Sequence, residues 1–364
     1  MGGYKGRVVP ARPRPLLVVL SGALLTVLVA GGGDASQSAA SPSPPVLARS
    51  IDAQPGTALR ANRLARASIA WRGGSISTST GEVVSVLVSD ALPVESTPES
   101  WAELLVKLTH GPELSLLTAY IAPLDEVQEL CGARALGCYS SNQMVSLGDA
   151  AIDEDTPEEV VRHEYGHHVA FHRLNAPWRA IDWGPKQWAS AATVCPRVSR
   201  REAFPGDEGQ NYSQNPGEAW AEVYRLMDER KVGITAATWR IIAPAFFPDE
   251  AALQAAERDV LQPWTAGRTA AFRRTFGKRT PKVWWIPLST PLDGDLRITA
   301  ALPGAGLHEV ALVGANRSTV LRRAQWIGQR SKRITTTVCG QRSLFVRVTQ
   351  SGALGRVTVS ASTP

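Results

Sequence analysis

The chain has 364 residues, of which 44% are hydrophobic and 20% are charged, and its formal net charge is +6. This composition excludes wholesale disorder, a collagen-like fibre and a long coiled coil, and the length allows two or three domains. Without residues 1–40, which carry four basic residues and one acid, the excess of positive charge falls to +3. Because no block of Lys and Arg then remains, we expect no nucleic-acid partner.

Residues 1–40 have the pattern of a signal peptide. The apolar stretch of residues 16–30 follows a basic leader, is short for a membrane span, and precedes small residues such as Ala35 and Ala40 that suit cleavage. The pattern predicts a secreted protein with no stable membrane partner after cleavage, and an uncleaved N-terminal anchor is the alternative. Residues 41–75 begin rich in Pro and Ser and are expected to form a linker or a propeptide-like segment.

The next residues alternate between strand and helix patterns. Short apolar runs predict strands at residues 83–89, 116–122 and 144–147. Helical spacing from Trp101 to Leu108 predicts a helix that starts near Thr97 and Pro98. Strands that alternate with helices indicate a mixed α/β or α+β layer.

The four cysteines are even in number, and an oxidising compartment favours disulfides. Cys131 and Cys138 flank a short loop, CGARALGC, and are expected to pair, which leaves Cys195 to pair with Cys339. A zinc–thiolate site is the competing interpretation, but no CxxC spacing supports it.

Longer helices are expected in the middle of the chain. Thr156 and Pro157 are typical of a helix start, and Asn215-Pro216 starts a second helix that runs to about Arg230. More helix is expected between Trp239 and Phe276, with a break near Pro244–Pro248.

After Pro281 the composition changes to short β-rich runs with turn signals roughly every ten residues, which predicts an all-β sandwich. The sequence therefore predicts an α+β fold with a catalytic domain over residues 76–280 and a sandwich over residues 281–364.

One motif carries the chemistry. Residues His163, Glu164 and His167 form an HExxH pattern within a predicted helix. Positions i and i+4 lie on one face of a helix, so both imidazoles can bind one Zn²⁺ ion. The neighbouring glutamate can take a proton from metal-bound water. A histidine-rich solvated helix face is the alternative.

A catalytic zinc site needs a third protein ligand. The metzincin pattern requires Gly and His three and six residues after the second histidine, but those positions hold Ala170 and Arg173. His172 is one residue short of the required place. A ligand from the neighbouring part of the same helix is therefore not expected.

The second helix supplies a better candidate. In the sequence NPGEAWAE, Glu218 can be the third ligand, and Glu222 lies one turn later on the same face. Glu222 could accept the ring N–H of a ligand histidine, with His163 as the first choice. In the alternative interpretation, Asn215 and Glu218 form a capping box, and the glutamate reaches back to a backbone N–H.

HEYGHHV followed by NPGEAWAEVYR resembles the gluzincins, the thermolysin-like class of zinc metallopeptidases, over residues 156–226. The sequence is most similar to exported bacterial members and to the catalytic domain of anthrax lethal factor. The resemblance implies a zincin-like fold in which His163, His167 and Glu218 bind zinc and Glu164 is general base and later proton donor. The sequence departs from thermolysin because it lacks the NEAxSD motif and a counterpart of the transition-state histidine.

The resemblance has three further implications. Tyr212 would donate a hydrogen bond to the oxyanion, as in lethal-factor-like sequences with a tyrosine before the ligand glutamate. The segment Tyr139 to Leu147 would be the strand edge that pairs with substrate, with the Cys131–Cys138 bridge supporting it. The C-terminal strands resemble, in pattern, the pre-peptidase β-sandwich of exported bacterial proteases.

These observations predict a secreted metallopeptidase that hydrolyses bonds in a peptide or protein substrate by means of a zinc-bound water activated by Glu164. Two other classes remain open. One is an exported binding or adhesion protein with a structural or vestigial zinc site. The other is a zinc hydrolase that acts on a non-peptide amide.

Overall fold

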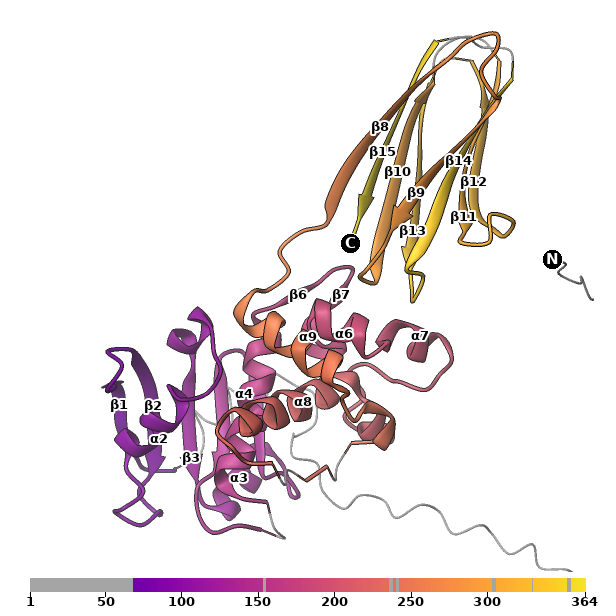
Figure 1. Ribbon diagram of the computed structural model, residues 1–364. Coiled ribbons are helices and arrows are strands. Elements are labelled where there is room, and N and C mark those ends of the chain that lie inside the picture. Colours follow the sequence, from indigo (N-terminus) through magenta and orange to yellow (C-terminus); the bar gives the residue numbers. More distant parts are fainter. Residues whose placement is uncertain are drawn as a thin grey trace, which may run out of the picture. The chain divides into compact units, whose positions relative to one another are not determined.

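The computed structural model describes residues 68–152, 155–235, 238–239, 242–302, 306–328, 330–351 and 355–364. The predicted signal peptide, and the predicted linker as far as residue 67, lie outside these ranges. The described residues contain helices and several sheets, including a β-sandwich region, which confirms the α+β prediction (Figure 1). No helix among them is both long enough and apolar enough to cross a membrane.

The first sheet has five strands in the order β1-β2-β3-β5-β4. Its central strands β2, β3 and β5 are parallel, and the outer strands β1 and β4 pair antiparallel with their neighbours. The strands are β1 (Trp71–Ser77), β2 (Val83–Ser89), β3 (Thr118–Ala122), β4 (Gly137–Ser140) and β5 (Gln143–Leu147). The central strands have apolar sequences because parallel strands are usually covered on both faces.

The predicted strands at residues 83–89 and 144–147 are confirmed as β2 and β5. The strand predicted at residues 116–122 is shorter than expected. Residues 112–116 form the 3₁₀ helix η1 (Pro112–Leu116), and β3 starts only at Thr118. Helix α2 (Pro98–Leu105) starts where Thr97 and Pro98 predicted, with the Thr97 side chain accepting a hydrogen bond from the Ser100 N–H. Helix α3 (Leu124–Cys131) had no strong sequence signal.

The expected substrate-pairing segment, Tyr139 to Leu147, requires a correction. It spans a hairpin, in which β5 lies inside the sheet between β3 and β4, so β5 is not an edge. The edge strand is β4, and all four of its residues are buried. The turn between the strands places Ser141 and Asn142 at positive φ, which folds the segment back on itself.

Two long helices follow in the central part of the chain, and the first of them packs both against this sheet and against the second helix. Helix α4 (Pro157–Phe171) begins with a capping box, because Thr156 accepts from the Glu159 N–H and the Glu159 carboxylate accepts from the Thr156 N–H. Helix α8 (Pro216–Lys231) begins at Asn215, whose side chain accepts from the Gly217 N–H. Both start sites agree with the sequence prediction.

Helices α4 and α8 pack closely where Gly166 faces Ala221. A Cβ at Gly166 would lie 2.9 Å from the Cα of Ala221, so the approach needs a residue without a side chain. The Trp220 indole N–H donates to the Gly166 carbonyl at 2.8 Å, which fixes the two helices beside the contact. The motif residues on α4 are therefore held against α8.

Shorter elements complete the helical part. The elements are β6 (Leu174–Asn175), β7 (Trp178–Arg179), α5 (Ala180–Trp183), α6 (Lys186–Ala191), α7 (Val194–Ser199), η2 (Tyr212–Gln214), η3 (Pro244–Phe246) and α9 (Glu250–Leu261). Helix α9 falls in the predicted helical region after the expected break near Pro244–Pro248.

The remaining strands form two four-stranded antiparallel sheets, ordered β13-β10-β15-β8 and β12-β11-β14-β9. The strands are β8 (Arg268–Phe276), β9 (Val283–Ser289), β10 (Gly294–Leu302), β11 (Leu307–Gly314), β12 (Val320–Ile327), β13 (Arg330–Val338), β14 (Ser343–Ser351) and β15 (Gly355–Thr363). Alternate residues of β10, β14 and β15 are buried, as expected for two sheets that share one core.

The prediction of helix up to Phe276 was wrong. Residues 268–276 form strand β8, which pairs with β15 along its whole length. The strands of the sandwich therefore begin at Arg268, before the boundary at residue 281 that the composition predicted. The Ala- and Arg-rich sequence of β8 is compatible with a helix, and pairing with β15 decides its conformation.

The two predicted disulfides are present. Cys131 at the end of α3 is bonded to Cys138 in β4, and Cys195 in α7 is bonded to Cys339 after β13. The second bond joins residues 144 positions apart and links the helical part to the sandwich. No free cysteine remains.

Candidate metal centre

Three predicted ligand residues meet where α4 faces α8. His163 and His167 come from successive turns of α4, and Glu218 comes from the first turn of α8. One potential ligand atom from each lies within 4.8 Å of the other two, and all three residues are buried. Glu218 Oε2 lies 3.2 Å from His163 Nε2 and 3.4 Å from His167 Nε2. This buried His–His–Glu cluster could hold a metal ion.

The alternative role of Glu218 in a capping box is not observed. Its carboxylate points to the two histidines, while the Asn215 N–H donates to the Tyr212 carbonyl at 2.9 Å. The N-terminus of α8 is capped by Asn215 alone. Glu218 is therefore available to the cluster.

Glu222 lies at the other ring nitrogen of His163. Its Oε2 is 3.6 Å from His163 Nδ1 and accepts a 2.6 Å hydrogen bond from Arg225 Nε. Arg225 also donates to Glu229 at 2.8 Å. The carboxylate of Glu222 is thus held between a guanidinium and an imidazole.

The electrostatics of the cluster favour a positive charge in it. Burial alone would lower the pKa of His163, but the hydrogen bonds that its ring donates to the Glu218 and Glu222 carboxylates raise it to about 10. Burial would raise the pKa of Glu222, but the charge of Arg225 and the contact with His163 lower it to about 2. The pKa of Glu218 is lowered as well: burial opposes this shift, and the charge of His167 is its largest cause. Two buried carboxylates around two imidazoles form a site that attracts cations.

Tyr212 is also at the cluster. It lies in η2, just before α8, and its hydroxyl donates a 2.6 Å hydrogen bond to Glu218 Oε2. Two other tyrosines near these helices are oriented elsewhere. The Tyr165 hydroxyl points to the Glu113 carboxylate at 3.5 Å, and the Tyr224 hydroxyl donates to the Thr109 carbonyl at 2.7 Å.

Glu164 is completely buried and faces strand β4. A Cβ at Gly137 would lie 2.6 Å from Glu164 Oε1 and 2.8 Å from its Cγ. The Glu164 side chain therefore occupies the space that any other residue at position 137 would fill. The disulfide at Cys138 ties this part of β4 to α3.

The other two histidines of the motif region lie apart from the ligand cluster, as their helical offset predicts. His168 Nε2 lies 2.8 Å from the Glu113 carbonyl, and its Nδ1 lies 3.1 Å from the Tyr139 hydroxyl. Burial lowers the pKa of His168 to about 4. His172 Nε2 lies 2.6 Å from the side-chain oxygen of Asn142. Both histidines stabilise the contact between α4 and the β4–β5 hairpin.

Sequence reasoning missed two residues that position this centre. Arg225 had a weak signal, because it follows Glu222 by three positions on one helix face. Gly137 had none, since its contact with Glu164 joins residues far apart in the sequence.

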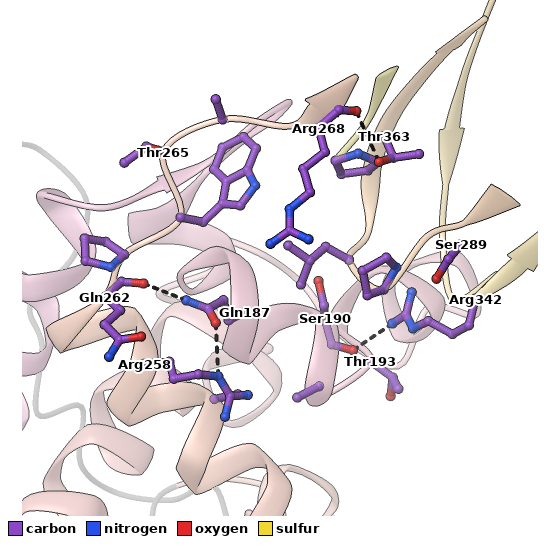
Figure 2. Close-up of a pocket in the computed structure, with 18 residues that line it drawn as sticks. Gln187, Ser190, Thr193, Arg258, Gln262, Thr265, Arg268, Ser289, Arg342 and Thr363 are labelled. Carbon is purple, nitrogen blue, oxygen red and sulfur yellow. Dashed lines mark hydrogen bonds between the residues drawn. The ribbon is translucent and has the colours of Figure 1, made fainter. Parts of the chain in front are cut away.

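A separate pocket lies away from this cluster (Figure 2). Its lining contains Arg258, Arg268 and Arg342 and no Asp or Glu. Arg258 donates to the Gln187 side chain, and Arg342 donates to the Ser190 carbonyl and to the Asp293 carboxylate. None of the residues of the His–His–Glu cluster lines this pocket.

Comparisons with known proteins do not assign a family. No protein-family model matches the chain, and no curated protein matches it. Among solved structures, 27% of the chain is similar to 85% of a chain of the disulfide-linked pili of Bacillus endospore appendages, with 13% identity and a TM-score of 0.20.

Latent PorU of Porphyromonas gingivalis matches 28% of the chain over 13% of its own length, with 9% identity and a TM-score of 0.19. The coat protein of Tobacco streak virus matches 26% of the chain over 86% of its own length, with 11% identity and a TM-score of 0.17. Similarities at these TM-scores carry no argument about fold or function.

Proposed function

We propose that the chain is a zinc-dependent metallopeptidase of the gluzincin type. The observation that carries the proposal is the buried cluster in which His163, His167 and Glu218 present ligand atoms within 4.8 Å of one another. Two imidazoles and one carboxylate are a ligand set that catalytic zinc sites use, with a further position left for water or substrate. The zincin-like character of the α+β domain is part of the same proposal.

The donor set suits a divalent cation. Burial disfavours a charge on His163, but the two carboxylates that flank it raise its pKa to about 10, so the cluster favours a positive charge at this point. Glu222 would accept the ring N–H of His163 and orient its other nitrogen toward the metal. Zn²⁺, when bound, would supply Lewis-acid chemistry that polarises a carbonyl and makes water more acidic.

Glu164 is the proposed general base. A glutamate at this position is not needed to bind the metal, so its presence inside the HExxH motif favours a catalytic role over a structural zinc site. Its carboxylate, held between α4 and Gly137, would take the proton of the attacking water and later return it to the leaving amine. This role requires a carboxylate with a fixed position near the ligand set.

Tyr212 is the proposed donor to the oxyanion. It is the tyrosine whose hydroxyl lies at the ligand cluster, whereas those of Tyr165 and Tyr224 bond to Glu113 and to the Thr109 carbonyl. A phenol at the edge of the site can donate a hydrogen bond to the developing negative charge on the substrate oxygen. Its present bond to Glu218 keeps the ring in place.

We also propose that the protein is exported and acts on a peptide or protein substrate. The two disulfides are compatible with an oxidising compartment. The signal-peptide pattern of residues 1–40 supports export on sequence grounds alone.

The test is to measure metal content and peptide cleavage in the same preparations. Glu218→Ala should lose most of the bound zinc and all cleavage of an unbiased peptide library, because one of three ligands is removed. Glu202→Ala is the matched control, since this exposed acid pairs with the exposed Arg200 at 2.7 Å and should keep both properties. Unchanged zinc stoichiometry in Glu218→Ala would reassign the site. Zinc binding without hydrolysis of any peptide would favour a binding protein or an amidase with another substrate.

A further inference from the structure

The charge of the chain is divided unevenly along its length. Residues 268–364 contain 16 Lys and Arg but only three Asp and Glu, whereas residues 68–267 contain 15 basic and 28 acidic residues. The charges of residues 68–364 sum to zero, and this balance conceals a strongly basic sandwich and an acidic helical part. A charge asymmetry of this size indicates interaction of the basic part with an anionic partner.

The three acids of the sandwich do not neutralise this charge at one of its ends. Asp293 pairs with Arg342, Asp295 lies 4.0 Å from Arg297, and Glu309 lies 2.7 Å from Arg347. These pairs account for every Asp and Glu side chain between residues 268 and 364.

The end of the sandwich at which β8 leads into β9 has no Asp or Glu among its described residues. We call it the basic end. The described residues that meet there are 274–284, 300–302, 306–308, 326–328, 330–333, 350–351 and 355–356, and none of them is Asp or Glu. Exposed cations in the described parts of these segments are Lys278, Arg279, Lys282, Arg333 and Arg356. The nearest carboxylate along the strands is that of Glu309, which Arg347 already engages.

Aliphatic side chains project from the same end. Ile327 at the end of β12 is 74% exposed, and Leu307 at the start of β11 is 52% exposed. The two are direct partners across the β11–β12 ladder, so they form one apolar surface. A pair of exposed aliphatic side chains at the same end as exposed cations is the combination by which proteins bind a membrane surface.

The opposite end of the sandwich is the one that contacts the helical part. There, Cys339 is bonded to Cys195, and the Asp293 N–H donates to the Ser190 side chain. Strands of nine residues such as β10 span about 30 Å, so the basic end lies about that far from these contacts. Its side chains are therefore not used in holding the two parts together.

We propose that the basic end of the sandwich binds an anionic lipid surface. Lys and Arg near a membrane are attracted by the negative potential of the lipid headgroups, and aliphatic side chains can insert among the acyl chains. Single-stranded nucleic acid would also attract the cations, but its recognition commonly uses aromatic side chains that stack on bases. The aromatic residues at this end, Phe276, Trp284 and Trp326, pack in or against the sandwich core. The proposal does not depend on the proposed peptidase activity.

A local probe tests the proposal in the full chain. Because the native cysteines are all in disulfides, Ile327→Cys can be labelled with an environment-sensitive nitrobenzoxadiazole dye. Addition of vesicles of phosphatidylglycerol and phosphatidylcholine should raise the emission several-fold and shift it to the blue, and vesicles of phosphatidylcholine alone should not. Val320→Cys is the matched control, since it is 41% exposed at the other end of the same strand and should not respond.

Charge variants of the sandwich then show whether the sandwich binds the lipid. Any binding by the apolar stretch of residues 16–30 is the same in every variant and cannot cause a difference between them. Replacement of Lys278, Arg279 and Lys282 by Gln in one variant should weaken binding to the anionic vesicles on the order of 100-fold at low salt, at about five-fold per charge. The same change at the exposed residues Arg317, Arg322 and Arg323, nearer the other end, should alter it much less.

Three results would overturn the proposal. The first is an unchanged emission at position 327 with anionic vesicles. The second is an equal response at positions 320 and 327, or an equal response to phosphatidylcholine alone. The third is an equal response to a single-stranded oligonucleotide, which would identify a general polyanion site in place of a lipid site.

Discussion

Replacement of Gly137 by Ala would place a methyl group where the catalytic base is proposed to lie. The new Cβ would be 2.6 Å from Glu164 Oε1, 2.8 Å from its Cγ and 3.0 Å from its Cδ. Ordinary contact begins at 3.4 Å, so the carboxylate oxygen must move by about 0.8 Å. Because Cγ is also too close, rotation of the terminal carboxylate alone does not relieve the clash.

The backbone of strand β4 has little freedom to move away. Cys138 is in a disulfide with Cys131, and the Leu147 N–H donates to the Leu136 carbonyl beside Gly137. Most of the displacement should therefore fall on Glu164. A shift of about 1 Å in a catalytic group typically lowers the rate by about 100-fold.

The assay is steady-state cleavage of the best library peptide, with zinc content measured on the same sample. We expect Gly137→Ala to lower kcat by about 100-fold while the zinc stoichiometry stays at the wild-type value. Gly209→Ala is the control, since its nearest neighbour would be an Asp207 oxygen at 3.4 Å. A variant with intact zinc and wild-type kcat would show that the position of Glu164 does not limit the reaction.

Three other substitutions have definite expected outcomes. Glu222→Gln should weaken zinc affinity by about 10- to 100-fold in a competition assay with a chelator, because it removes the charge beside His163 Nδ1. Replacing Cys195 and Cys339 together by Ser should lower the free energy of unfolding by about 2 to 5 kcal/mol in a denaturant titration, and no change would mean that the long loop is already restrained. Glu113→Gln should cost about 3 to 5 kcal/mol, because it leaves Arg173 buried without its partner at 2.9 Å.

The pH dependence of the last variant follows from the direction of the pKa shift. Burial opposes ionisation of Glu113, but the charge of Arg173 and the Gly111 N–H lower its pKa in the folded protein. The stability that this pair contributes is present above the ordinary glutamate pKa of about 4.3 and is lost as the pH falls below it. A plot of melting temperature against pH should therefore fall less steeply at acidic pH for Glu113→Gln than for the wild type. An equally steep fall in both proteins would contradict this assignment.

Local sequence signals were sufficient for the parts of the site that lie within one helix. The i, i+4 spacing of His163 and His167 and the cap at Thr156 are set by neighbouring residues, so a single segment predicts them. Glu218 required only that a second helix place a carboxylate nearby. Only the orientation of the Glu218 side chain in the structure distinguishes a metal ligand from a residue of a capping box.

The features that could not be predicted depend on contacts between distant segments. Gly137 reads as an ordinary loop glycine, and only the packing of β4 on α4 brings it against Glu164. Residues 268–276 have a composition compatible with a helix, and only their pairing with β15 makes them a strand. The basic end of the sandwich was hidden for another reason, since the net charge averages an acidic and a basic part.

The most direct test of the central claim is the activity of Glu164→Gln measured together with its zinc content. Gln keeps the size of the side chain between α4 and Gly137 but cannot accept a proton from water at neutral pH. The account predicts wild-type zinc stoichiometry, an unchanged melting temperature and loss of peptide hydrolysis. Cleavage of the peptide library at the wild-type rate by this variant would contradict the proposed mechanism.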